Sequence, residues 1–78
     1  MTRSEILEKA IEIAAETLSA DPEGITEETT LEELEADSLD AIEIITALEE
    51  EFGITFDDDQ LESLDSLASL VTAIENLV

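Results

Sequence analysis

A serine hydroxyl flanked by two carboxylates is the most chemically suggestive arrangement in this sequence. Ser38 lies between Asp37 and Asp40, where a polar loop gives way to apolar residues at helical spacing. A helix start presents unpaired backbone N–H groups and the positive end of the helix dipole, and both favour a phosphate held there. A hydroxyl at this point can also project outward to a modifying enzyme. Helix capping is the competing role of Ser38, and it is the more frequent one for a serine taken alone.

The residue types that are missing exclude most catalytic chemistry. Cysteine and histidine are absent from all 78 residues, which excludes disulfides, thiolate zinc sites and imidazole acid–base catalysis. Carboxylate pairs could do acid–base work only in a cleft, and a chain this small hardly provides one. We therefore expect neither an enzyme nor a metal centre.

The charge balance points to basic partners. The chain has 23 Asp and Glu residues against Arg3 and Lys9, for a formal net charge of -21 at pH 7. Such a surface repels nucleic acid and accelerates encounters with basic proteins, although salt weakens the effect. Because the apolar residues are periodic and make up 44% of the chain, the acidity does not indicate disorder.

The sequence shows no sign of a membrane segment. No apolar run approaches the roughly 18 residues of a membrane span, and residues 1–9 lack the basic-then-apolar order of a secretory signal. We therefore expect a protein that does not span a membrane and stays in the cytoplasm, or in an organelle if a transit peptide has been removed.

The first half of the chain is predicted to form one long helix and a long loop. A capping box at Thr2–Glu5 opens the helix, and Asp21–Pro22 ends it. Its outward face carries Glu5, Glu8, Glu12 and Glu16. The loop runs to about Thr30, with Ile25 as a core anchor, and Leu31–Leu34 is expected to form a single helical turn with Leu31 as a second anchor.

The second half is predicted to form two long helices with a short one between them. One long helix starts at Asp37 or Ser38 and ends at Gly53. Its inward stripe is expected to be Leu39, Ile42, Ile45, Leu48 and Phe52. Residues 57–60 offer a cap for the short helix, which contains Leu61 and could extend to Leu64. The last helix is capped by Asp65 or Ser66. The sequence therefore predicts an all-α fold: a small four-helix bundle of three long helices and one short helix, in a single domain over residues 1–78.

The stretch Glu35–Asp40 resembles the attachment motif of acyl carrier proteins, which carry phosphopantetheine on the serine of an Asp-Ser-Leu sequence. Asp37, Ser38 and Leu39 match that motif. Residues 47–52 look like the end of the family's second helix, and the order of the helices agrees over essentially the whole chain. A lone Asp-Ser-Leu is weak evidence, but length, acidity and helix order strengthen it.

The resemblance implies a non-catalytic monomeric carrier with a covalent 4′-phosphopantetheine on Ser38, on which acyl chains travel as thioesters. The transferase that adds this group would be one partner, assisted by Asp37. Acyl-processing enzymes with basic patches, most simply those of fatty acid synthesis, would be the others. The expected docking residues are Asp40, Glu43, Glu49 and Glu50. The expected lining of an acyl pocket is Ile42, Ile45, Leu61 and Leu64.

One residue departs from the family pattern. Glycine is frequent three positions before the modified serine, whereas this chain has Glu35. If the backbone there has a positive φ, the glutamate adds strain or the loop turns differently.

Three other functions compete with an acyl carrier in fatty acid or polyketide synthesis. A peptidyl or aminoacyl carrier more often has two glycines before its motif. A calcium-binding protein is suggested by the acidic run at residues 57–59, but the ligand spacing of an EF-hand is missing. An acidic mimic of nucleic acid would bind a basic enzyme without any need for Ser38.

Overall fold

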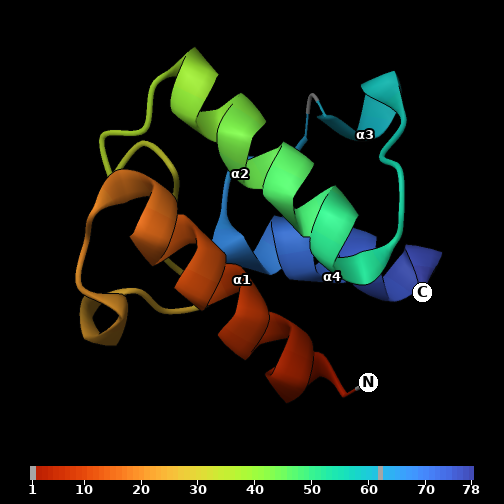
Figure 1. Ribbon diagram of the computed structural model, residues 1–78, viewed down its shortest axis with the longest axis horizontal. Helices are drawn as coiled ribbons and strands as arrows, with labels where there is room; N and C mark the ends of the chain where they lie inside the picture. The colour runs from red at the N-terminus through yellow and green to blue at the C-terminus, as the bar shows by residue number, and fades with distance from the viewer. Residues whose placement is uncertain (1, 62) are drawn as a thin grey trace.

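The computed structural model describes residues 2–61 and 63–78, and over these residues the chain folds as a helical bundle. Its elements are α1 (Arg3–Leu18), the short 3-10 turn η1 (Pro22–Gly24), α2 (Ser38–Phe52), α3 (Asp58–Leu61) and α4 (Leu67–Leu77). α1 packs against both α2 and α4, and α1 and α2 run in opposite directions (Figure 1). The short α3 lies to one side of this trio. The predicted all-α bundle of three long helices and one short helix is confirmed.

The core is built mainly from aliphatic side chains of the three long helices, with Phe56 as its buried aromatic residue. Its fully buried large side chains are Ile6, Ile44, Leu48, Leu67, Leu70, Val71 and Ile74. Ala10 and Ala14 are also fully buried, and such small side chains let α1 approach its neighbours closely. Ile25 and Leu31, the predicted anchors of the long loop, are both buried in this core.

The predicted inward stripe of α2 is wrong in part. Ile44 and Leu48 are completely buried, whereas Leu39 is 64% exposed and Ile42 is 59% exposed. Ile45 and Phe52 are half-buried. α2 has apolar residues on two adjoining flanks. Leu39 and Ile42 lie on the exposed flank, whereas Ile45 and Phe52 pack against the core beside Ile44 and Leu48. Helical periodicity alone does not decide which of two such flanks is buried. Leu39 and Ile42 were therefore predicted to face the core, and Ile44 was not.

The loop before α2 is fastened to the start of α4. The Leu67 amide donates to the Thr29 carbonyl at 3.0 Å, and the Ala68 amide donates to the Glu27 carbonyl at 2.9 Å. In the other direction, the Leu31 amide donates to the Asp65 carbonyl at 2.9 Å. The bonds from Leu67 and Ala68 use first-turn amides of α4 that have no partner inside the helix. The loop thus helps to cap α4, and α4 in turn fixes the loop.

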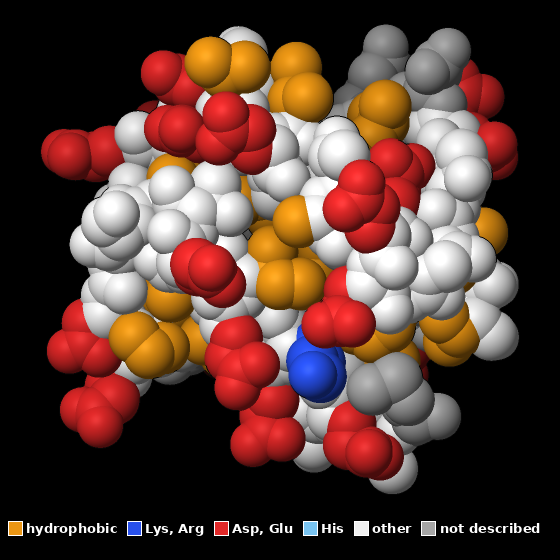
Figure 2. All heavy atoms as spheres, in the orientation of Figure 1, with side chains coloured by type: hydrophobic (Ala, Val, Ile, Leu, Met, Phe, Trp, Pro, Cys, Tyr) orange, Lys and Arg blue, Asp and Glu red, His pale blue; other side chains and the backbone are white. Residues whose placement is uncertain are grey.

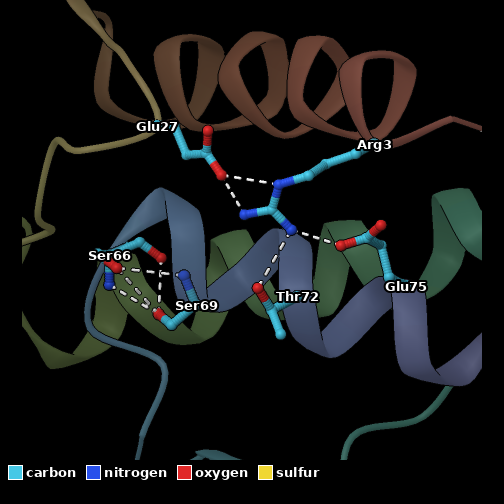
Figure 3. Close-up of polar contacts among 6 residues, drawn as sticks. All are labelled: Arg3, Glu27, Ser66, Ser69, Thr72 and Glu75. Atoms are coloured by element: carbon cyan, nitrogen blue, oxygen red, sulfur yellow. Dashed lines mark hydrogen bonds and ion pairs between the residues drawn. The ribbon is translucent and has the colours of Figure 1, made fainter.

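Arg3 adds a second connection between the loop and α4 (Figure 3). Its Nε donates to Glu27 Oε1 at 2.8 Å, and its Nη1 donates to Thr72 Oγ1 at 3.2 Å. The guanidinium also forms ion pairs with Glu27 and Glu75. The hydrogen bonds to Glu27, and then those to Glu75, raise the pKa of Arg3. One cation therefore joins the start of α1, the long loop and α4.

Side chains cap the long helices, as the sequence predicts. Thr2 and Glu5 form the predicted capping box of α1. Ser66 caps α4, with its hydroxyl accepting from the Ser69 amide at 3.2 Å (Figure 3). Gly53 ends α2 in the left-handed region, with φ of 64°.

Glu35 ends the single turn predicted at Leu31–Leu34. The amides of Glu35 and Ala36 donate back to the carbonyls of Glu32 and Leu31, each at 3.0 Å. This is the Schellman pattern, which requires left-handed backbone at the residue that Glu35 occupies. Glu35 accordingly has φ of 60°. A side chain with a Cβ pays about 1–2 kcal/mol in that region, so the strain expected for a glutamate here is present.

Glu35→Gly should stabilise the protein, with Glu35→Ala as the matched control. Both changes remove the same charge, but only glycine relieves the left-handed strain. Allowing for the extra chain entropy of glycine, we expect Glu35→Gly to exceed Glu35→Ala by about 0.5–1 kcal/mol in free energy of unfolding. Urea denaturation of both variants measures this difference. An alanine variant as stable as the glycine variant would show that the turn is unstrained.

Candidate functional site

Ser38 is the first residue of α2, and its side chain is exposed. The cap of the helix is its neighbour Asp37, whose Oδ1 accepts from the Asp40 amide at 2.9 Å. Asp40 Oδ2 in turn accepts from the Asp37 amide at 3.4 Å, which completes a capping box. The predicted helix start is confirmed, and capping falls to Asp37. The Ser38 hydroxyl therefore does not cap α2.

The backbone around Ser38 fits a phosphodiester. Of the first amides of α2, that of Asp40 donates to the Asp37 side chain, and that of Ala41 donates to the Asp37 carbonyl at 2.9 Å. Among the described residues, the amides of Ser38 and Leu39 have no acceptor. Two N–H groups at the positive end of the helix are thus available beside the hydroxyl, and together they favour an anion there. The carboxylates of Asp37 and Asp40 oppose that preference.

A hollow of about 370 Å³ extends from Ser38 along the α3 side of α2. Its lining residues are Ser38, Ala41, Ile42, Ile45, Thr46, Glu49, Leu61 and Leu64. The structure thus brings together around one hollow, next to Ser38, the four side chains expected for an acyl pocket. Ala41, Thr46 and Glu49 also line the hollow and were not predicted from the sequence. Their spacing from Ser38 could have indicated this, because residues three and four positions apart lie on the same face of a helix.

A second hollow lies on the loop side of Ser38. It has a volume of about 310 Å³ and a more polar rim. Its lining residues are Thr30, Leu31, Glu32, Ala36, Asp37, Ser38, Ala41, Leu64 and Asp65. Ser38, Ala41 and Leu64 belong to both hollows, so Ser38 stands between two recesses. Nothing in the sequence predicted the second one.

The four acidic residues expected to dock partners are not equivalent. Glu43 and Glu50 are exposed, whereas Asp40 and Glu49 are half-buried. Asp40 is part of the capping box, and Glu49 Oε2 accepts a hydrogen bond from the Phe56 amide at 2.9 Å. Figure 2 shows acidic side chains spread over one whole face, with basic atoms confined to a small spot. Glu43 and Glu50 are therefore the freest carboxylates of this set.

The described part of the chain shows neither a metal-binding cluster nor a membrane-spanning helix. Over residues 2–61 and 63–78, no group of three or more Asp or Glu side chains is arranged to hold a metal ion. No helix formed by these residues is long and apolar enough to cross a membrane.

The sequence matches the model of a known protein family. Residues 8–74 match the family described as "Phosphopantetheine attachment site". The acyl carrier protein of Thermosynechococcus vestitus is 47% identical over 79 aligned positions, which cover 100% of this chain and 98% of that protein. The acyl carrier protein of Campylobacter hominis is 42% identical, over 94% of each chain.

Solved structures agree with these sequence matches. The acyl carrier protein of Thermotoga maritima superposes with a TM-score of 0.83 at 30% identity, covering 97% of this chain and 89% of that one. The acyl carrier protein of Enterococcus faecalis gives a TM-score of 0.81 at 28% identity, with 100% of both chains covered.

Family, sequence relatives and fold therefore agree over nearly the whole chain. The function that follows is that of a non-catalytic protein that carries acyl groups on a covalently attached 4′-phosphopantetheine. Its partners include a phosphopantetheinyl transferase and acyl-processing enzymes. The chain belongs to the phosphopantetheine-attachment family, among the acyl carrier proteins.

Proposed function

We propose that Ser38 carries the 4′-phosphopantetheine and that the chain serves fatty acid synthesis in the cytoplasm as a monomer. The observation that carries this proposal is an exposed serine hydroxyl at the first position of α2, next to an aspartate that takes over the cap. Ser38 is also the serine of the Asp-Ser-Leu sequence within the matched residues 8–74. Intact mass of the protein from its native source would identify the cargo, and so separate fatty acid from polyketide service.

The attachment step is a phosphoryl-type transfer to the serine. The Ser38 Oγ attacks the phosphorus next to the pantetheine of coenzyme A. The bond from that phosphorus to the bridging oxygen of the diphosphate breaks, and adenosine 3′,5′-bisphosphate leaves. The hydroxyl proton passes to a base of the transferase. After transfer, the free amides of Ser38 and Leu39 would stabilise the phosphodiester charge. The thiol of the added group is what binds acyl chains when it is present.

Ser38→Ala should abolish loading and leave the fold intact. Because Asp37 caps α2, the free energy of unfolding should change by no more than about 0.5 kcal/mol. Intact mass after incubation with a transferase and coenzyme A measures loading. Ser4→Ala, at another exposed serine in the first turn of a helix, is the matched control and should load like the wild type. Loading of Ser38→Ala, or none of the wild type, would overturn the proposed attachment.

The apolar hollow beside Ser38 is the proposed resting place of the acyl chain. Ile42, Ile45 and Leu61 present aliphatic carbon there, and burial of each methylene of a chain contributes about 0.8 kcal/mol. The hollow starts at the attachment residue, so a tethered chain reaches it without leaving the protein.

Loading with an octanoyl group should therefore shift the methyl resonances of Ile42, Ile45 and Leu61. Loading with an acetyl group, which is too short to fill the hollow, should shift them far less. Ile11 of α1, which does not line the hollow, provides the reference methyl. Methyl spectra that are identical for the acetyl and octanoyl forms would contradict chain burial.

The exposed carboxylates of α2 are proposed to guide basic partners. Glu43→Lys should slow association with the transferase several-fold at low salt, because exposed charges at the rim of an interface act mainly on the encounter rate. Glu12→Lys, on the outward face of α1, changes the net charge equally and should slow association less. Stopped-flow measurements at two salt concentrations test this. Equal association rates for the two variants would show that only the net charge of the protein matters, and would refute a docking role for Glu43.

A further inference from the structure

Glu49, near the end of α2, accepts hydrogen bonds from the segment that follows the helix, through both its backbone carbonyl and its side chain. Its carbonyl accepts from the Ile54 amide at 3.0 Å, and its carboxylate oxygen Oε2 accepts from the Phe56 amide at 2.9 Å. Phe56 is itself buried in the core. Rotating the carboxylate away would leave the Phe56 amide without this acceptor, and a partly buried donor that loses its partner is destabilising. The hydrogen bond from the Phe56 backbone amide therefore holds the Glu49 carboxylate in place.

The same side chain lies at the far end of the hollow that starts at Ser38. The lining residues of α2 run from Ser38 to Glu49 along one helix face, a distance of about 16 Å at 1.5 Å per residue. Between them lie Ala41, Ile42, Ile45 and Thr46. Among the described lining residues, Glu49 is the one that carries an ionisable group. The hollow thus changes from aliphatic to charged at its end.

A carboxylate at that point limits how far an apolar chain can extend. A chain end that reached Glu49 would strip water from the carboxylate, which has no ion pair among the described residues. Burial of a charge without a counter-ion is strongly unfavourable, even with one hydrogen bond in place. The carboxylate does not move aside without breaking its bond to the Phe56 amide. Methylenes that stop short of Glu49 gain from burial, whereas further methylenes meet the charge and gain nothing.

We infer that Glu49 is a positioning residue that sets the length of acyl chain this protein shelters. The inference rests on the proposed function, in which the hollow beside Ser38 receives the chain. It gives Glu49 a role that differs from docking, because it acts on the cargo in the absence of any partner enzyme.

The test is a chain-length series on the isolated loaded protein. Butanoyl, octanoyl, dodecanoyl and hexadecanoyl forms of the wild type and of Glu49→Gln are compared by the rate at which hydroxylamine cleaves the thioester. A sheltered chain slows cleavage. Gln keeps an oxygen that can accept from the Phe56 amide but removes the charge. Glu50→Gln, an equal change of charge at the exposed neighbouring residue outside the hollow, is the matched control.

In the wild type, protection should rise with chain length and then level off. In Glu49→Gln it should keep rising beyond that length, by up to about fourfold for each additional buried methylene, the factor that corresponds to about 0.8 kcal/mol. Glu50→Gln should follow the wild type. A plateau at the same length in Glu49→Gln and the wild type would overturn the role of Glu49.

A second variant tests the same idea from the opposite direction. Thr46→Asp places a carboxylate three residues closer to Ser38 at an exposed lining position and leaves Glu49 and its bond to Phe56 untouched. Protection should then level off at a shorter chain, and an unchanged plateau would contradict the inference even if Glu49→Gln folds poorly. A wild type with no dependence on chain length would instead refute the acyl hollow itself, and the inference with it. Thermal unfolding of each unloaded variant checks that it is folded.

Discussion

The hydrogen-bonded pair of Asp37 and Asp40 is the constraint on which the site depends. Each carboxylate accepts the backbone amide of the other residue, at 2.9 and 3.4 Å. This pair begins α2 without any help from the residue between them that carries the hydroxyl. Ser38 is consequently free to be exposed at a helix start, where two amides remain available for an anion. Had Ser38 been the cap, modification of its hydroxyl would have removed the cap of its own helix.

The rest of the bundle keeps this helix start in one place in spite of its charge. With a net charge of -21, self-repulsion works against the compact state. Both basic residues of the chain are engaged: Arg3 with Glu27 and Glu75, and Lys9 with Glu51 at 3.8 Å. The Arg3 contacts and the backbone bonds between the loop and α4 secure the segment that leads to Ser38. The strained Schellman turn at Glu35 then connects this segment to Asp37, where α2 is capped.

Local chemistry made the helices and their caps predictable. Thr2–Glu5, Asp37 and Gly53 carry their signals in neighbouring residues, and each lies where the sequence indicates. The burial of α2 was only half predictable, because Ile42 and Ile44 are equally apolar and only the packing of α1 and α4 decides which is buried. The hollow's four aliphatic residues followed from the family resemblance. The bond from the Phe56 amide to Glu49 depends on how the chain turns after Gly53, and the contacts of Arg3 join residues 24 and 72 positions apart, so neither could be read from local spacing.

We propose that the start of α2 offers its free amide donors to a phosphate on Ser38. Amide resonances of the protein before and after transfer of the phosphopantetheine group test it most directly. We expect the resonances of the Ser38 and Leu39 amides to move most, toward the positions of hydrogen-bonded N–H groups. The Asp40 and Ala41 amides, already bound to Asp37, should move much less. Resonance changes centred on Asp40 and Ala41, or on residues outside this helix start, would contradict a phosphate bound by the Ser38 and Leu39 amides.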